Sequence, residues 1–349
     1  MKLSELHFDL PPEQIAQEPC QRRDASRMLK LDRQTGTFSD HQFFEIANFL
    51  RPGDVLVLNN TRVFPARLLG HREGFTGRVE VFLVREQGPN LWLSLVKPGR
   101  RIPVGTKLTF ADGRLRGEVV ERTPDGRRII QFQSEEPFHT VVDAIGQTPL
   151  PPYIHRYASG DVRLDRDTYQ TVYARERGAI AAPTAGLHFT PELLQRLRDN
   201  GVEIVELTLH VGYGTFQPIQ TETIEEHHLE GEYFEIPQTT ADRVNAAKRE
   251  GRRVIAVGTT STRTLETAAT VTDDGVELSA GNGMSELLIY PGYEFKILDG
   301  LITNFHLPNS SLLALVCAFG GYETVMNAYR HAVEDKYRFF SYGDCMLLV

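Results

Sequence analysis

The chain has 349 residues, of which 41% are hydrophobic and 24% charged, so it can bury a sizeable core and its length favours two domains. This composition excludes an intrinsically disordered chain, and a formal net charge of −8 speaks against a protein that binds nucleic acid through bulk charge alone. The longest apolar run, residues 312–319, is too short to cross a bilayer.

The cysteines and the N-terminus indicate where the protein works. Cys20, Cys317 and Cys345 are odd in number and widely spaced, which argues against a disulfide framework and against a cysteine zinc site. The first residues include Glu5 and Asp9 and lack the basic and apolar regions of a secretory signal. We therefore expect a cytoplasmic protein.

The first half of the chain is dominated by predicted strands. An apolar strand is expected at 55–58, and turns rich in Gly, Pro, Asn and Asp separate the strands that follow. These later strands are predicted at 78–85, 91–97, 107–110, 116–121 and 128–133. Short strands at this spacing are typical of a small antiparallel barrel or sandwich.

This strand-rich segment also differs in charge from the rest of the chain. Residues 64–149 contain 13 Lys and Arg against 10 Asp and Glu, a balance of +3, whereas the remainder carries 25 against 36, a balance of −11. Lys97, Arg100 and Arg101 cluster on one predicted loop. They are candidates for contacts with nucleic-acid phosphates, and the alternative is a solvated hairpin tip.

After residue 169 strands and helices alternate. Residues 179–182 are predicted to form a strand, and Thr190 with Pro191 predicts the start of a helix that Gly201 ends. A strand at 202–210, a helix at 241–250, a strand at 253–258 and a helix from about 261 follow. We therefore expect an α/β fold with two domains: an α/β barrel-like body formed by residues 1–63 and 150–349, and a small antiparallel β-barrel inserted at 64–149.

Polar residues gather where predicted strands end, which is where α/β sheets bind ligands. The segments are 59–62, 183–189, 210–216, 258–263 and 303–308. Each also has a structural explanation: Gly212 and Gly214 could form a tight turn, and the hydroxyls at 259–262 could cap a helix rather than hold a carboxylate or phosphate.

The histidines allow a metal site as an alternative. His210, His227, His228 and His306 invite a metallohydrolase hypothesis. However, no His-Glu-x-x-His motif occurs, and the adjacent His227 and His228 would point apart in a strand and diverge on a helix. We expect no catalytic metal.

Blocks along the whole chain carry a family resemblance. They are LPP at 10–12 with AQ at 16–17, RDASR at 23–27, NNTRVFPAR at 59–67, LVKP at 95–98, LPPYI at 150–154, YQTVYA at 169–174, AAPTAGLHFT at 181–190, the stretches 208–218 and 257–266, LITNFHLP at 301–308 and YRFFSYGD at 337–344. In this order they resemble the S-adenosylmethionine:tRNA ribosyltransferase-isomerase family of queuosine biosynthesis.

The resemblance implies an unusual transfer. S-adenosylmethionine would donate its ribosyl group, rather than its methyl group, to 7-aminomethyl-7-deazaguanine at the anticodon wobble position of tRNA, and the group would isomerise to an epoxycyclopentanediol as adenine and methionine leave. The partners implied are S-adenosylmethionine and this tRNA, without a membrane. The resemblance implies no metal and no cofactor beyond S-adenosylmethionine as co-substrate. We expect a monomer.

The chemistry assigns expected roles to the matched positions. Histidine suits the proton transfers because its pKa is near neutrality, so His210 is expected to remove the first proton, with His188 as runner-up and His306 as a further catalytic residue. Phe189, Phe216 or Tyr213 would stack on adenine or meet the sulfonium. The predicted substrate-binding residues are Arg62, Thr184, Gly186, Phe189, Gly212, Gly214, Thr215, Phe216, Thr259, Thr260, Arg263 and Asn304.

Some positions depart from the family pattern. Asn60 stands where members often have Asp, Tyr213 where they have a small residue, and Glu230 where they have a second histidine; the stretch 283–286 is also atypical. Asn60 and Glu230 are therefore left out of the expected site. These departures support a rival hypothesis, a tRNA-binding paralogue that has lost catalysis, while the retained His188, His210, Arg263 and His306 argue against it.

Overall fold

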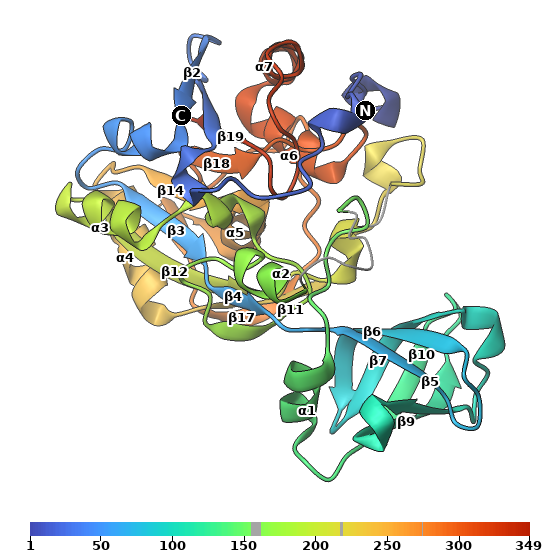
Figure 1. Cartoon of the computed structure of the whole chain (residues 1–349). Helices are drawn as coiled ribbons and strands as arrows, with labels where there is room; N and C mark the ends of the chain where they lie inside the picture. The colour runs from blue at the N-terminus through green and yellow to red at the C-terminus, as the bar shows by residue number, and fades with distance from the viewer. Residues whose placement is uncertain (155–161, 217–218, 274) are drawn as a thin grey trace.

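A computed structural model describes residues 1–154, 162–216, 219–273 and 275–349, apart from the side chains of 162–164 and 215–216. Figure 1 shows two parts, a large body that contains both termini and a smaller barrel beside it. The chain enters the barrel after β4 (Thr61–Val63) and returns through α1 (Phe138–Ile145). The body is thus built from both ends of the chain.

The body centres on a nine-stranded sheet with the order β17-β13-β12-β3-β14-β18-β19-β1-β2. Its strands are β1 (Arg27–Leu31), β2 (Phe38–Gln42), β3 (Val55–Asn59), β12 (Glu203–Leu209), β13 (Glu232–Ile236), β14 (Val254–Val257), β17 (Gly281–Ser285), β18 (Gly300–Asn304) and β19 (Cys345–Leu348). The four strands β12, β3, β14 and β18 run parallel, so their carboxyl ends share one edge. The sheet has two free edges, so the body is an open α/β layer rather than a closed barrel.

Helices cover both faces of this sheet. The helices described in the body are α2 (Val162–Thr168), α3 (Pro191–Asp199), α4 (Gln238–Arg249), α5 (Gly258–Ala268), α6 (Ser311–Gly320) and α7 (Tyr322–Glu334). Alternate residues of β3 point to opposite faces: Val55 and Val57 join the core under α4, α6 and α7, while Leu56 and Leu58 join the core under α3. Burial on both faces explains why β3 is apolar throughout.

The smaller part is a closed antiparallel barrel with the order β10-β7-β6-β5-β8-β9. Its strands are β5 (Arg67–Arg72), β6 (Arg78–Gly88), β7 (Leu91–Lys97), β8 (Lys107–Phe110), β9 (Leu115–Arg122) and β10 (Arg128–Gln133). Gly70 permits close packing, because a Cβ there would lie 2.3 Å from the Thr109 carbonyl oxygen. Phe138 and Val142 of α1 complete the barrel core.

The structure confirms the α/β class and the inserted antiparallel barrel, whose strands lie inside the predicted range 64–149. The domain boundaries themselves remain a prediction. The strand expected at 179–182 is wrong: β11 (Glu176–Ala179) pairs with β4 and ends there, and 180–182 leave the ladder. A two-stranded ribbon of β15 (Ala269–Thr272) and β16 (Gly275–Leu278) completes the fold.

Helix α5 also begins earlier than expected, at Gly258 rather than near Ser261. Gly258 adopts a φ of +88°, a conformation open to glycine, so the chain turns from β14 into the helix without a linker. Among the described residues, no single helix is long and apolar enough to cross a membrane, although α6 and α7 would pass that test together across a 117° bend.

Candidate active site

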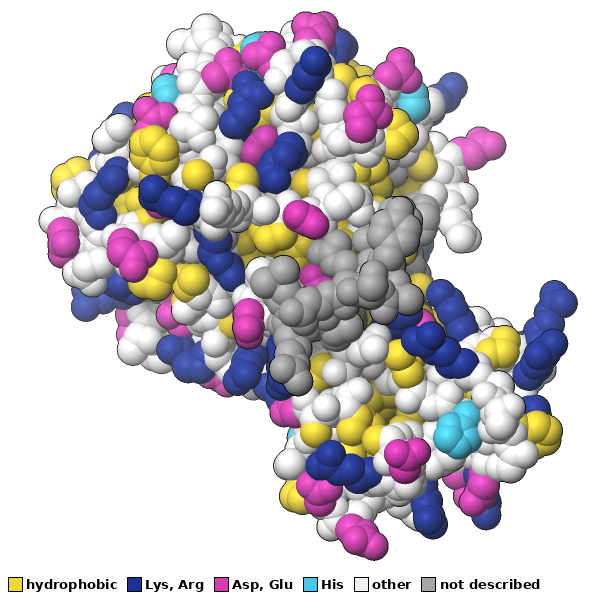
Figure 2. All heavy atoms as spheres, viewed as in Figure 1, with side chains coloured by type: hydrophobic (Ala, Val, Ile, Leu, Met, Phe, Trp, Pro, Cys, Tyr) yellow, Lys and Arg dark blue, Asp and Glu magenta, His cyan; other side chains and the backbone are white. Residues whose placement is uncertain are grey.

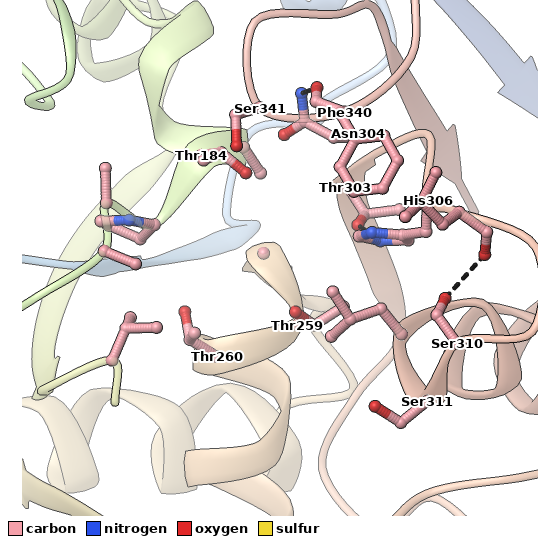
Figure 3. Close-up of a pocket in the computed structure, with 18 of the residues that line it drawn as sticks. Thr184, Thr259, Thr260, Thr303, Asn304, His306, Ser310, Ser311, Phe340 and Ser341 are labelled. Atoms are coloured by element: carbon pink, nitrogen blue, oxygen red, sulfur yellow. Dashed lines mark hydrogen bonds between the residues drawn. The ribbon is translucent and has the colours of Figure 1, made fainter. Parts of the chain in front are cut away.

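A cavity with a volume of about 470 Å³ lies at the carboxyl ends of the parallel strands. Residues that follow these strands line it, including Val211 after β12, Gly258 after β14 and Asn304 at the end of β18. Figure 3 shows Thr259 and Thr260 at the start of a helix, with Thr184, Asn304, Phe340 and Ser341 gathered across from them. A cavity of this size and place suits a small organic ligand.

The first turn of α5 forms one wall of the cavity. The N-cap residue, Val257, makes no side-chain hydrogen bond to this helix start, and Thr259 and Thr260 both line the cavity. The hydroxyls of Ser261 and Thr262 donate to the carbonyls of Val257 and Gly258, so these two are engaged within the helix. Uncapped amides at a helix start attract anions, and a carboxylate is therefore the group this wall fits.

Asn59 explains why a strand ends on an Asn-Asn-Thr-Arg segment. Its Oδ1 accepts from the backbone N–H groups of Thr61 and Leu209, at 3.1 and 3.0 Å. Its Nδ2 donates to the Leu209 carbonyl at 3.0 Å and lies 3.2 Å from the Thr260 hydroxyl. This fully buried amide therefore ties β3, β12 and the start of α5 together at the cavity edge.

Among the described residues, His306 is the one histidine that lines the cavity. Its Nε2 lies 2.8 Å from the Thr303 hydroxyl, and its backbone N–H donates to the Tyr329 hydroxyl at 3.1 Å. Burial lowers the pKa of His306 to about 3. The imidazole is thus neutral at physiological pH.

His188 stands behind the cavity wall rather than in it. Its Nδ1 lies 2.7 Å from the Ser26 hydroxyl, its Nε2 lies 3.2 Å from Asn304 Nδ2, and its ring packs against Phe43. Burial, and then the nearby charges of Arg338 and Arg23, lower the pKa of His188 to about 3. This side chain is also neutral, and Asn304 separates it from the cavity.

His210 lies one residue before the cavity-lining Val211. Its Nδ1 is 2.8 Å from the Thr61 hydroxyl, and its ring stacks on Tyr233. A Cβ on Gly178 would come within 2.5 Å of this ring, so glycine is needed there. Partial burial lowers the pKa of His210, which keeps it neutral and able to accept a proton, although it is not among the cavity-lining residues.

The aromatic lining differs from the prediction. Tyr153, Tyr169 and Phe340 line the cavity, and the rings of Tyr153 and Phe340 lie 4.1 Å apart. Phe340 has a φ of +73°, which is rare for a bulky residue and indicates a strained backbone held by its surroundings. Reasoning from sequence missed these residues, although the LPPYI and YRFFSYGD blocks contain Tyr153 and Phe340.

Several predicted substrate-binding residues lie outside the cavity. Phe189 is completely buried and packs on Phe43, so it could stack on a ligand only if the core opened. Tyr213 packs on Phe82 of the barrel. Gly186 sits beneath Tyr173, whose hydroxyl would lie 2.0 Å from an added Cβ. The side chains of Thr215 and Phe216 are outside the described part of the chain.

Arg263 takes a structural partner instead of facing the cavity. Its guanidinium pairs with Glu232 at 2.6 Å and donates to the carbonyls of Ser285 and Leu287, with both charged side chains buried. Glu232 also accepts from the Gly212 backbone N–H at 2.8 Å. Gly214, Glu232 and Arg263 line a separate pocket of about 30 Å³. The guanidinium that was expected to bind a substrate carboxylate is therefore already engaged by groups of the protein.

Other predicted residues map to the outer surface. Arg62 is exposed and lines a cleft between body and barrel together with Arg166 and Arg177. Lys97, Arg100 and Arg101 are exposed at the end of β7 and the turn after it. Figure 2 shows Lys and Arg side chains on the barrel beside the hollow that separates it from the body.

The four histidines weighed for a metal site do not come together in the described residues. Three groups that could hold an ion, Asp40, His331 and Asp335, do lie close together, at a partly exposed surface position. Tyr337 and Arg27 already engage Asp40 there. None of these three residues lines the cavity, so the cluster adds nothing to the cavity chemistry.

Comparison with known proteins places this geometry in context. The model of the queuosine biosynthesis protein family matches residues 3–348. Proteins named S-adenosylmethionine:tRNA ribosyltransferase-isomerase are similar over the full length of both chains, at 53% identity in Carboxydothermus hydrogenoformans and 48% in Desulfitobacterium hafniense. The crystal structure of S-adenosylmethionine tRNA ribosyltransferase from Thermotoga maritima is 39% identical, with a TM-score of 0.57, and the match covers 99% of this chain and 100% of that one.

Proposed function

Because this chain belongs to the queuosine biosynthesis protein family, we infer that it is a transferase with the activity its relatives are named for. It transfers the ribosyl group of S-adenosylmethionine to 7-aminomethyl-7-deazaguanine in the wobble position of tRNA and isomerises it, with release of adenine and methionine. Full-length similarity and the retained His188, His210 and His306 disfavour an inactive paralogue.

The single observation that carries the site assignment is the cavity at the strand ends. Its volume of about 470 Å³ suits a ligand the size of S-adenosylmethionine. The uncapped start of α5 would receive the methionine carboxylate, with Thr259 beside it. Tyr153 and Phe340 would take the adenine or the sulfonium, since aromatic faces attract cations and stack on bases.

The reaction needs proton transfers that neutral imidazoles can perform. The sulfonium acidifies the hydrogens on the neighbouring ribose carbon, so a base can remove one, and departing adenine needs a proton on nitrogen. We assign the first removal to His210, whose lowered pKa keeps it unprotonated and whose Nδ1 is held by Thr61. His306 lines the cavity and would contact the bound donor from its wall. No metal enters this proposal, in keeping with the family's chemistry.

The tRNA would bind along the barrel. Lys97, Arg100 and Arg101 are exposed on the module with the +3 balance, and Figure 2 shows basic side chains beside the hollow that leads from the barrel to the body. Phosphate contacts would hold the anticodon stem there without reading its sequence. We propose that a single chain in the cytoplasm suffices for both sites.

The test is to incubate the protein with S-adenosylmethionine and tRNA bearing the deazaguanine, and to separate the products by chromatography. Adenine and methionine should appear only when both substrates are present. Release of S-adenosylhomocysteine would indicate a methyltransferase instead. Binding of both substrates without any product would support the inactive paralogue.

A further inference from the structure

The side-chain amide of Asn304 has only one orientation that its neighbours allow. Its Nδ2 lies 3.0 Å from the Phe340 carbonyl oxygen, which can only accept a hydrogen bond. Rotating the amide by 180° would set two acceptor oxygens against each other. The NH₂ group must therefore face Phe340, on the strained backbone at the cavity edge.

This orientation fixes the proton on His188. Asn304 Nδ2 also lies 3.2 Å from His188 Nε2, so that nitrogen must accept. The imidazole is neutral, and its proton must sit on Nδ1, which donates to the Ser26 hydroxyl at 2.7 Å. Ser26 in turn donates to the Arg23 carbonyl at 3.3 Å. The hydrogen bonds thus run in one donor-to-acceptor direction, from Asn304 through His188 and Ser26 to the Arg23 carbonyl.

The remaining atom of the amide, Asn304 Oδ1, has no hydrogen-bond partner within the described part of the chain. Asn304 is only 2% exposed, and it lines the cavity. Figure 3 shows it beside Ser341, Phe340 and Thr184 around the same space. A buried acceptor without a donor is costly, so such an atom calls for a partner, and at a cavity wall that partner can be a bound ligand.

We propose that Asn304 Oδ1 accepts a hydrogen bond from an N–H group of a substrate, and that His188 is a positioning residue that aims this oxygen. The inference deepens the proposed function and rests on it. The N–H donors available are the exocyclic amine of adenine, the methionine ammonium and the N–H groups of the deazaguanine. His188 then does not transfer a proton in the reaction, which replaces its predicted catalytic role.

Two substitutions of His188 separate positioning from catalysis. In His188→Gln, the Gln amide oxygen can take the place of Nε2 and accept from Asn304, whereas the shorter side chain of His188→Asn reaches only the Nδ1 position. We expect His188→Gln to keep turnover within about threefold of the wild-type rate. We expect His188→Asn to lose roughly tenfold in turnover, because asparagine leaves the buried hydrogen bond from Asn304 unmade. If both variants lost roughly 10²–10⁴-fold in turnover, His188 would be a proton-transfer residue and the inference would be wrong.

A second experiment identifies the N–H group. The affinities of wild type and Asn304→Ala are measured for S-adenosylmethionine, for its analogue with hydrogen in place of the adenine amine, for its analogue without the α-amine, and for the substrate tRNA. The variant should weaken at least one natural substrate by roughly 10-fold or more. The analogue that lacks the contacting group should bind wild type and variant equally.

A matched control comes from Asn245, a buried asparagine that pairs with Leu278 away from the cavity. Asn245→Ala should lower stability and leave all affinities unchanged. If Asn304→Ala bound every probe as wild type does, the inference would fail while adenine release by wild type still upheld the proposed function. If wild type itself released no adenine, the proposed function would fail first.

Discussion

The body and the barrel of this protein use their polar residues in opposite ways. In the body, His188, His306 and Asn304 are buried, neutral and held by hydrogen bonds to one another or to neighbouring residues. On the barrel, Lys97, Arg100 and Arg101 are charged and exposed. The contrast teaches that the body is organised for orientation in a low-dielectric site, while the barrel is organised for long-range attraction to an anion.

Ion pairs show the same contrast. Arg263 and Glu232 form a buried pair in the body, with further hydrogen bonds to both partners. Arg114 and Glu136 form an exposed pair on the barrel. Solvent screens the second pair, whereas the first leaves a buried charge if either partner is removed. Substitutions in the two regions should therefore differ in kind as well as in size.

The largest effect is expected at His210. His210→Ala should lower turnover by roughly 10²–10⁴-fold while donor and tRNA affinities stay nearly unchanged, because a general base acts in the transition state. Adenine release and deuterium uptake at the sulfur-bearing ribose carbon, followed in deuterated water, measure this step. Adenine release at the wild-type rate would clear His210 of the role.

The next effect is on stability. Glu232→Ala should lower the free energy of unfolding by about 3–5 kcal/mol, because the buried Arg263 guanidinium would lose its carboxylate. Glu136→Ala on the barrel should change it little, since that pair is exposed. Denaturant titration measures both variants. Equal small losses in the two would show that Arg263 is free to bind a ligand, as the sequence suggested.

Acid should destabilise the body through its buried histidines. The pKa of His188 and of His306 is about 3 in the folded protein, below the usual value of 6.5, so the unfolded chain binds more protons between these values. Stability should therefore be fully present above pH 6.5 and fall as the pH drops towards 3, by about 1.4 kcal/mol per pH unit for each histidine.

Denaturant titrations over this pH range test that slope in His188→Gln. The variant should show a shallower loss than wild type, because glutamine does not titrate. An unchanged slope in His188→Gln would contradict the burial argument.

The smallest effect is expected at the barrel surface. Replacing Lys97, Arg100 and Arg101 together by Ala should weaken tRNA binding at low salt. The slope of log affinity against log salt concentration should become shallower by about three, one for each lost phosphate contact. Turnover at saturating tRNA should persist. Unchanged tRNA affinity across a salt series would remove these residues from the tRNA surface.

The local patterns were sufficient for much of the fold. The barrel strands at 91–97, 107–110 and 128–133 are confirmed at the predicted residues, because alternation and turn residues act within a few positions. Thr190 caps α3 as predicted, accepting from the Leu193 N–H at 3.1 Å. The strand expected at 179–182 failed because an apolar run that packs in the core need not join a ladder.

The sequence by itself determined that four polar segments lie at one edge of the sheet, because parallel strands bring their carboxyl ends together and 59–62, 210–216, 258–263 and 303–308 stand at the ends of β3, β12, β14 and β18. It also placed Thr184, Thr259, Thr260, Asn304 and His306, all of which line the cavity. Which polar groups remain open to a ligand was decided only by tertiary structure. Arg263 forms an ion pair with Glu232, Phe189 packs in the core, and His188 lies within 3.2 Å of Asn304. These partners are distant in sequence, so only the packing of the folded chain brings them into contact.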